Sequence, residues 1–224
     1  MQHRTLCVKR RRGRRGLSLL EALVGLTLAP IVLAGIHSSY RAQVFALAAH
    51  NTSFGLQDTA RGTLDLVVRE VRMAGFDPTG AALPTAPGPA CPGVRQGVVE
   101  ATPTRLHIRA DLNGDGLLTG AGEDVLYALD TTVGEIQRTD NGTTVTLATG
   151  VASDALAFRY FDSNDPPGEL VGTPALTAGQ RDCVGTVAVV VRTQATHPDP
   201  TVSTALESEA SSQVAIRSRA LINF

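Results

Sequence analysis

The stretch LSLLEALVGLTLAPIVLAGI, from Leu17 to Ile36, decides how the rest of the chain is organised. Every side chain in it is apolar or small except the carboxylate of Glu21. An apolar run of about 20 residues is long enough to cross a bilayer. A carboxylate in hydrocarbon is costly unless it is paired, so such a group is by default a functional one. The stretch therefore predicts a membrane-spanning helix with a functional acid near its start.

The charges of the chain are divided sharply at this stretch. Residues 1–16 contain seven of the 20 basic side chains and no acid, so 13 basic groups face 21 acidic ones in the remainder. Basic residues just before an apolar span hold that end in the cytoplasm. The acidic remainder is unsuited to binding nucleic acid through its phosphates, and we expect no nucleic-acid partner. Because only 4% of the residues are aromatic, a stacking platform for bases or sugars is also disfavoured.

Three interpretations of this N-terminus compete. A secretory signal peptide could be cut after Ala34, but a signal peptide requires an unbroken apolar core, and Glu21 interrupts this one. A plain transmembrane anchor gives no reason for Glu21. The third interpretation accounts for the acid.

The segment Arg15-Gly16-Leu17-Ser18-Leu19-Leu20-Glu21 resembles the cleavage site of type IV prepilins. In that family a short basic leader ends in glycine, and an apolar stretch follows with glutamate at its fifth position; Leu17 stands where the family usually has Phe. The resemblance implies that a prepilin peptidase removes residues 1–16 by cutting between Gly16 and Leu17 and that the new amine of Leu17 is methylated. Glu21 would then neutralise this amine, in a neighbouring subunit or in its own chain, since a buried charge needs a partner.

From Leu17 to about Ala74 the chain is predicted to form one long helix. Apolar or small residues recur at helical spacing on one side, and charged residues occupy the other side after residue 60. A helix on the order of 85 Å is too long for a compact domain to cover. We therefore expect residues 17–40 to form a projecting transmembrane and assembly segment, and residues 41–224 to form a periplasmic head. Pro30 should kink the projecting half, and Gly75 with Asp77-Pro78 should end the helix.

After the helix, residues 75–97 are predicted to be a Pro/Gly-rich loop, and residues 98–224 to be rich in β-strands. Asn141-Gly142 indicates a two-residue hairpin turn. Hairpins without intervening helices predict an antiparallel sheet, so the fold class is α+β: one long helix packed on an antiparallel β-sheet. The expected strands are Gly97–Ala101, Arg105–Ala110, Asp124–Leu129, Gly134–Arg138, Thr143–Ala148, Ala155–Phe161, Gly185–Thr193 and Gln213–Phe224.

The sequence VREVRMAGFDP, residues 68–78, is also similar to the PilW group of minor pilins. This resemblance implies a minor pilin of a type IV pilus that waits in the bacterial inner membrane and then reaches the pilus tip at the cell surface. Its implied partners are other minor pilins, the major pilin and a tip adhesin. Its implied roles are pilus biogenesis, adhesion and motility. A GspJ-like minor pseudopilin of a type II secretion system shares these N-terminal features. A rival of another class is a secreted or membrane-anchored binding domain or hydrolase with a signal sequence.

The loop DLNGDGLLTGAGED, residues 111–124, has the composition of a calcium site. Its first half matches a calcium loop in which alternating oxygen ligands converge on one cation. The acid that closes such a loop should fall at Gly122, but the nearest acids come one and two residues later, so a standard EF-hand is excluded. Two readings remain open: a Ca²⁺-binding β-loop, or a solvated turn that needs no metal. The candidate ligands are Asp111, Asn113, Asp115, the carbonyl of Leu117, Glu123 and Asp124.

Removal of the leader would take Cys7 away and leave Cys91 and Cys183 as an even pair, which suggests a disulfide in an exported chain. Two unpaired buried thiols are the alternative. No nucleophile elbow, phosphate-binding loop, His-Glu-x-x-His or Cys-x-x-Cys motif occurs in the sequence. We therefore do not expect an enzyme.

Overall fold

The computed structural model of the chain describes residues 18–88, 91–164 and 166–220, without the side chains of residues 219 and 220. It divides into two compact units, the first ending at Leu47 and the second running from Ala48 to the C-terminus. Each unit is described by itself below. The second unit is called the head.

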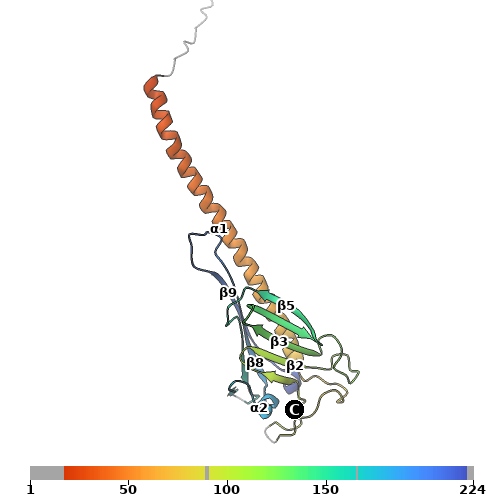
Figure 1. Cartoon of the computed structure of the whole chain (residues 1–224). Helices are drawn as coiled ribbons and strands as arrows, with labels where there is room; N and C mark the ends of the chain where they lie inside the picture. Colours follow the sequence, from red (N-terminus) through yellow and green to blue (C-terminus); the bar gives the residue numbers. More distant parts are fainter. Residues whose placement is uncertain (1–17, 89–90, 165, 221–224) are drawn as a thin grey trace, which may run out of the picture. The chain divides into compact units, whose positions relative to one another are not determined.

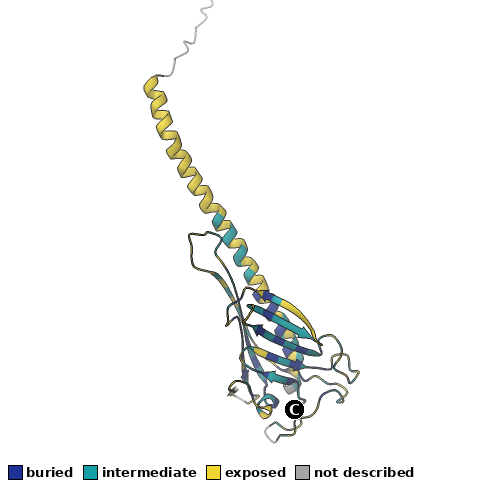
Figure 2. Cartoon of the chain, viewed as in Figure 1, coloured by how far each residue is buried: buried dark blue, intermediate teal, exposed yellow. Residues whose placement is uncertain are grey.

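The longest element is helix α1, Leu19–Met73, whose chain runs through both units (Figure 1). In the first unit its side chains are exposed almost throughout, including the large apolar ones of the membrane-length stretch (Figure 2). Pro30 lies inside the helix and does not end it. One window of this helix is long and apolar enough to cross a membrane, which is compatible with a membrane anchor or a signal sequence.

Within the head, the last turns of α1 pack on the β-sheets. Ala60, Leu64, Val67 and Val71 are buried, at the spacing of one helical face. The helix ends before Gly75, whose φ of 75° is a left-handed conformation that glycine adopts without steric cost. The predicted long helix with its stop at Gly75 is therefore confirmed.

The strands of the head form two antiparallel sheets, where the sequence led us to expect one. The first sheet has the order β1-β2-β3-β4-β5, and the second has the order β7-β6-β8-β9 (Figure 1). Because α1 packs against these antiparallel sheets, the α+β class is confirmed. The strands are β1 Val98–Ala101, β2 Arg105–Arg109, β3 Asp124–Asp130, β4 Glu135–Asp140, β5 Thr143–Thr149, β6 Leu156–Phe161, β7 Glu169–Leu170, β8 Thr186–Ala195 and β9 Leu206–Ala215.

Alternation along the strands supplies the core. In β3 and β8 every second side chain is buried, as expected for a strand with one face against the core. Val187, Val189 and Val191 of β8 are fully buried, and they belong to the same cluster as Val67 and Val71 of α1. One continuous apolar core therefore joins the helix to both sheets.

Two glycine positions fix the geometry around this core. Asn141 and Gly142 have φ values of 46° and 83°, both in the left-handed region, so the predicted two-residue turn between β4 and β5 is confirmed. Gly97 lies against Gly75 so closely that a Cβ at position 97 would fall 2.0 Å from the Gly75 nitrogen. Only glycine at position 97 allows the loop before β1 to return to the end of α1.

The prediction for the last strand was wrong. We expected Gln213–Phe224, but the strand that pairs with β8 is Leu206–Ala215; helix α3, Arg217–Ala220, follows it, and residues 221–224 lie outside the described residues. The inward positions of β9 carry small residues such as Ala210 and Ser212, so the sequence shows no apolar alternation there. β7 and the short helix α2, Ala178–Asp182, also escaped prediction, although Thr177 and Gln180 form a capping box at the start of α2.

Candidate functional site

The candidate assembly site is the start of α1, where the structure describes Ser18 onward. Ser18 caps the helix: its Oγ accepts a hydrogen bond from the Glu21 amide at 3.2 Å, and its carbonyl accepts one from the Ala22 amide at 3.1 Å. Glu21 therefore lies in the first turn, where the helix dipole favours a negative charge. Its side chain is exposed, so it can approach a positive group of a neighbour.

The predicted cleavage site lies outside the described residues. Gly16 and Leu17 directly precede Ser18, and nothing is stated about their placement. The predictions that the chain is cut between them, and that Leu17 is methylated, stay predictions. So does the pairing of Glu21 with the amine.

The acidic loop, residues 111–124, is organised by two buried carboxylates. The Asp111 side chain is fully buried; its Oδ1 accepts the Gly114 amide at 2.7 Å and its Oδ2 the Gly116 amide at 3.0 Å. Positive φ values at both glycines let the chain wrap around Asp111. This carboxylate is thus the centre of the first half of the loop.

Glu123 organises the second half in the same way. Only 1% exposed, it accepts the amides of Leu112 and Asn113 at Oε1, at 3.0 and 3.2 Å, and the amide of Gly120 at Oε2, at 2.6 Å. These amides satisfy the hydrogen-bonding capacity of a buried carboxylate. The structure therefore brings Asp111 and Glu123 into one loop and gives each carboxylate hydrogen-bond donors.

The other candidate ligands are arranged differently. Asp115 accepts the Leu117 amide at 2.7 Å and the Asn113 side-chain amide at 2.9 Å, both within the loop. Asp124, in contrast, binds His107 and Arg109 of β2. Within the described ranges, no three His, Cys, Asp or Glu side chains gather closely enough to hold a metal ion. Calcium binding by this loop stays a prediction.

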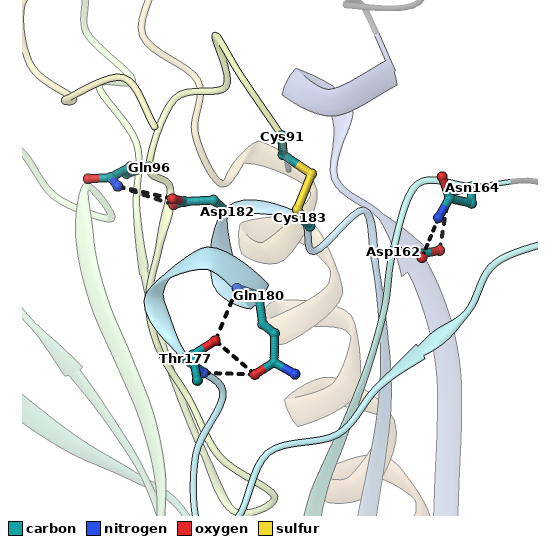
Figure 3. Close-up of a disulfide and its surroundings, with 8 residues drawn as sticks. All are labelled: Cys91, Gln96, Asp162, Asn164, Thr177, Gln180, Asp182 and Cys183. Carbon is teal, nitrogen blue, oxygen red and sulfur yellow. Dashed lines mark hydrogen bonds between the residues drawn. A yellow bond between two sulfur atoms is a disulfide. The ribbon is translucent and has the colours of Figure 1, made fainter. Parts of the chain in front are cut away.

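The loop after α1 is organised by hydrogen bonds to Asp77 and cross-linked by a disulfide. Asp77 accepts the amides of Gly80 at 2.7 Å and Leu83 at 2.9 Å. Burial raises the pKa of this carboxyl, but the two amides and nearby groups outweigh burial and hold the pKa below its usual value. Further along the loop, Cys91 is bonded to Cys183, which confirms the predicted pair (Figure 3).

The surroundings of the disulfide join the loop to helix α2. Cys183 is half-buried at the end of α2, and the preceding residue, Asp182, accepts hydrogen bonds from the Gln96 side chain at 3.2 and 3.3 Å (Figure 3). Gln96 belongs to the segment that leads into β1. The covalent bond and this hydrogen-bonded pair therefore hold the Pro/Gly-rich loop at two points to the end of α2, which precedes β8.

One half-buried charge network, joined to the buried Tyr127, had no signal in the sequence. Glu70 of α1 binds the Arg138 guanidinium of β4 through both carboxylate oxygens, at 2.8 and 3.1 Å, and accepts the hydroxyl of Tyr127. Burial and the Glu70 carboxylate raise the pKa of Tyr127. Burial lowers the pKa of Arg138, but Glu70 and Asp140 raise it more. Tyr127 and Arg138 lie 57 and 68 residues from Glu70 in the sequence, so no local sequence pattern could predict that they contact it.

Asp140 extends this network to the acidic loop. Its carboxylate accepts a hydrogen bond from the Arg138 guanidinium at 3.0 Å and from the Gly122 amide at 2.9 and 3.0 Å. The neighbouring Asn141 side chain donates to the Gly120 carbonyl at 2.6 Å. The acidic loop, the β4–β5 hairpin and α1 are therefore connected through consecutive polar contacts.

The histidines within the described residues are dispersed. His37 and His50 are exposed on α1, His107 pairs with Asp124, and His197 accepts the Asp199 amide at 3.0 Å in the loop after β8. No family model, curated protein or solved structure matches this chain.

Proposed function

We propose that this chain is a prepilin-type assembly subunit, a PilW-like minor pilin of a type IV pilus. In this proposal a prepilin peptidase removes residues 1–16, Leu17 is methylated, and the mature subunit waits in the inner membrane with its head in the periplasm. It then enters the pilus near the tip, beside other minor pilins, the major pilin and an adhesin. Its role is structural: it helps to start pilus assembly.

The observation that carries the proposal is the combination of Gly16, the acid at Glu21 and the exposed apolar surface of α1. Leu19, Leu26 and Ile31 are 83%, 77% and 68% exposed, and they lie in a helix window of mean hydropathy 2.2. A surface of this kind has to be covered by lipid or by other apolar helices. In a subunit that moves from a membrane into a helix-packed fibre, contacts with lipid are replaced by contacts with other apolar helices.

The charge of Glu21 is consistent with this exchange. Cleavage after Gly16 would create a positive amine one helical turn before the carboxylate, and methylation keeps that positive charge. In an apolar fibre interior, each charge is tolerated only beside its opposite. Pairing of Glu21 with the amine of a neighbouring subunit would therefore align the two helices along the fibre.

The head supports an exported location. The Cys91–Cys183 bond is stable in an oxidising compartment, whereas the cytosol keeps thiols reduced. Moreover, the apolar segment and the buried residues Ala60, Leu64, Val67 and Val71 belong to one helix, α1, which runs from Leu19 to Met73.

Identification of the first residue of the mature chain tests the proposal. The test is unambiguous because the sequence has so few amines. Lys9 is the only lysine, so a chain cut after Gly16 has a single amine, that of Leu17. Trypsin then releases peptide 17–41, and mass spectrometry should show one methyl group on its amine. Reductive labelling with deuterated formaldehyde should add one further methyl to this secondary amine and label no lysine. A mature chain that begins at Gly35, or one that retains Lys9, would overturn the proposal.

Gly16→Ala supplies the processing control. A prepilin peptidase requires glycine before the cut, so this variant should accumulate uncut, and normal maturation of it would count against that enzyme. Copurification then separates the two assembly systems. If the protein copurifies with pilins and an adhesin, the assignment to a type IV pilus is supported. If it copurifies with secretion pseudopilins, the protein belongs instead to a type II secretion pseudopilus.

A further inference from the structure

Two Asn-Gly dipeptides occur in the sequence, Asn113-Gly114 and Asn141-Gly142. Such a dipeptide can lose its side-chain amide without an enzyme: the backbone nitrogen of the glycine attacks the asparagine Cγ, ammonia leaves, and a succinimide ring remains. Glycine favours the attack because it has no Cβ to shield its nitrogen. Water then opens the ring to aspartate or isoaspartate. The two dipeptides share this chemistry, so their different surroundings in the head decide which of them reacts.

In the acidic loop, the structure blocks the reaction at Asn113. The attacking nitrogen would be that of Gly114, whose N–H donates to Asp111 Oδ1 at 2.7 Å. Asp111 is fully buried, so water does not compete for this bond. The Asn113 side chain is also held, because it donates to Asp115 at 2.9 Å. Before Gly114 could attack, its amide would have to leave a carboxylate acceptor, and such charge-assisted bonds are the strong ones.

In the turn between β4 and β5, the attacking amide is free. Asn141 and Gly142 are both exposed, and a Cβ built at Gly142 would have no atom within 4 Å. The hairpin closes on the pair Asp140–Thr143, so strand pairing does not use the Gly142 amide. Within the described residues this amide donates no hydrogen bond. Its nitrogen can therefore approach the neighbouring Cγ without first breaking a contact.

The side chain that would be converted connects two parts of the head. Asn141 Nδ2 donates to the Gly120 carbonyl of the acidic loop at 2.6 Å. After conversion a carboxylate oxygen would stand in place of this NH₂ group. It cannot donate, and it would bring a negative charge against the Gly120 carbonyl and beside Asp140. An acceptor that loses its donor in this way is destabilised. The contact between the hairpin and the acidic loop should therefore loosen.

We propose that Asn141 is a deamidation site of the folded protein, that Asn113 is protected, and that conversion of Asn141 loosens the acidic loop from the β4–β5 hairpin. Each conversion consumes one water and releases one ammonia, and it needs no oxidant or reductant. The converted fraction therefore rises with the age of the protein. This inference does not depend on the proposed function, because every group in it belongs to the head.

The chain supplies its own comparison for the test. Trypsin cuts after Arg109, Arg138 and Arg159, and no lysine lies between them, so Asn113 and Asn141 fall in separate peptides, 110–138 and 139–159. The full chain is purified in detergent and aged at mildly alkaline pH. Samples taken over time are digested and analysed by mass spectrometry. A sample digested at once corrects for conversion during digestion, and a reduced sample in concentrated guanidinium chloride shows both sites without the fold.

In the folded chain, peptide 139–159 should gain the mass expected when NH₂ is replaced by OH. Peptide 110–138 should gain it at least about tenfold more slowly, because the Gly114 amide must first leave its carboxylate acceptor. In the unfolded sample both peptides should convert at similar rates. Failure of Asn141 to convert in the folded chain, or conversion of Asn113 at the same rate there, would overturn the inference.

Substitutions at position 141 test the structural consequence. Asn141→Asp reproduces one product and should lower the melting temperature by about 2–4 °C, the effect of about one lost hydrogen bond. Asn141→Gly removes the donor without adding a charge and suits the φ of 46° at this position, so it should melt above Asn141→Asp. Ageing should lower the melting temperature of the wild type and leave that of Asn141→Gly unchanged. If Asn141→Asp melts like the wild type or like Asn141→Gly, the proposed loosening is wrong.

Discussion

Removal of the Cys91–Cys183 bond should destabilise the head strongly. The bond closes a loop with a sequence separation of 92 residues. The chain-entropy relation for a loop of this length gives about 4–5 kcal/mol of stabilisation through the unfolded state. For a domain of this size, each kcal/mol shifts the melting temperature by about 2–4 °C, so we expect a loss of roughly 10–15 °C.

The assay is thermal unfolding of the full mature chain in detergent, with and without a reductant, beside the double variant Cys91→Ser/Cys183→Ser. Because Cys7 would leave with the leader, a reductant has no other target in the mature chain. It should therefore lower the melting temperature of the wild type to near that of the double variant and leave the double variant unchanged. A wild-type shift below about 4 °C, equivalent to about 1–2 kcal/mol, would refute the loop-closure reasoning.

Four further predictions concern charged groups. Glu70→Ala should cost about 2–3 kcal/mol in urea unfolding, because the half-buried Arg138 keeps only Asp140 as a partner and the buried Tyr127 hydroxyl loses its acceptor; Asp154→Ala, which breaks an exposed pair, should cost less than about 1 kcal/mol. Asp77→Asn should be less stable than the wild type at pH 7. Because the folded pKa of Asp77 is lowered, this difference should shrink as pH falls below about 4, and a gap that persists in acid unfolding would contradict it. Glu21→Ala should leave leader cleavage intact but reduce the subunit in sheared fibres; undiminished assembly would show that the amine pairing is dispensable. Calcium binding by the acidic loop predicts a melting temperature that falls with excess chelator and recovers with added Ca²⁺, and an unchanged melting curve would reject the metal.

Several features of the fold could be predicted because they depend on neighbours along the chain. The end of α1 follows from the freedom of Gly75 at positive φ, and the β4–β5 turn follows from Asn141-Gly142. The core face of β8 follows from valines at every second position. In each case the deciding interactions lie within a few residues, so the pattern and the structure agree.

The last strand shows where this reasoning fails. β9 has small or polar residues at most of its inward positions, so its place in the sheet comes from backbone pairing with β8 rather than from its own apolar pattern. The acidic loop shows a related limit. The spacing of Asp111 and Glu123 indicates that both belong to one loop, but only the fold shows that backbone amides occupy them and that Asp124 turns to His107 and Arg109.

By itself, the sequence determined the long helix with its membrane-length apolar half, the basic residues 1–16 followed by Glu21, the β-rich head and the candidate cysteine pair. Length, hydrophobicity and turn geometry are local properties that a linear sequence records. Only the tertiary structure decided that the strands divide into two sheets, that Glu70 meets Arg138 and Tyr127, and that Asp111 binds the Gly114 amide. These features depend on which distant segments pack together, because burial and pairing energies arise only when the chain has folded.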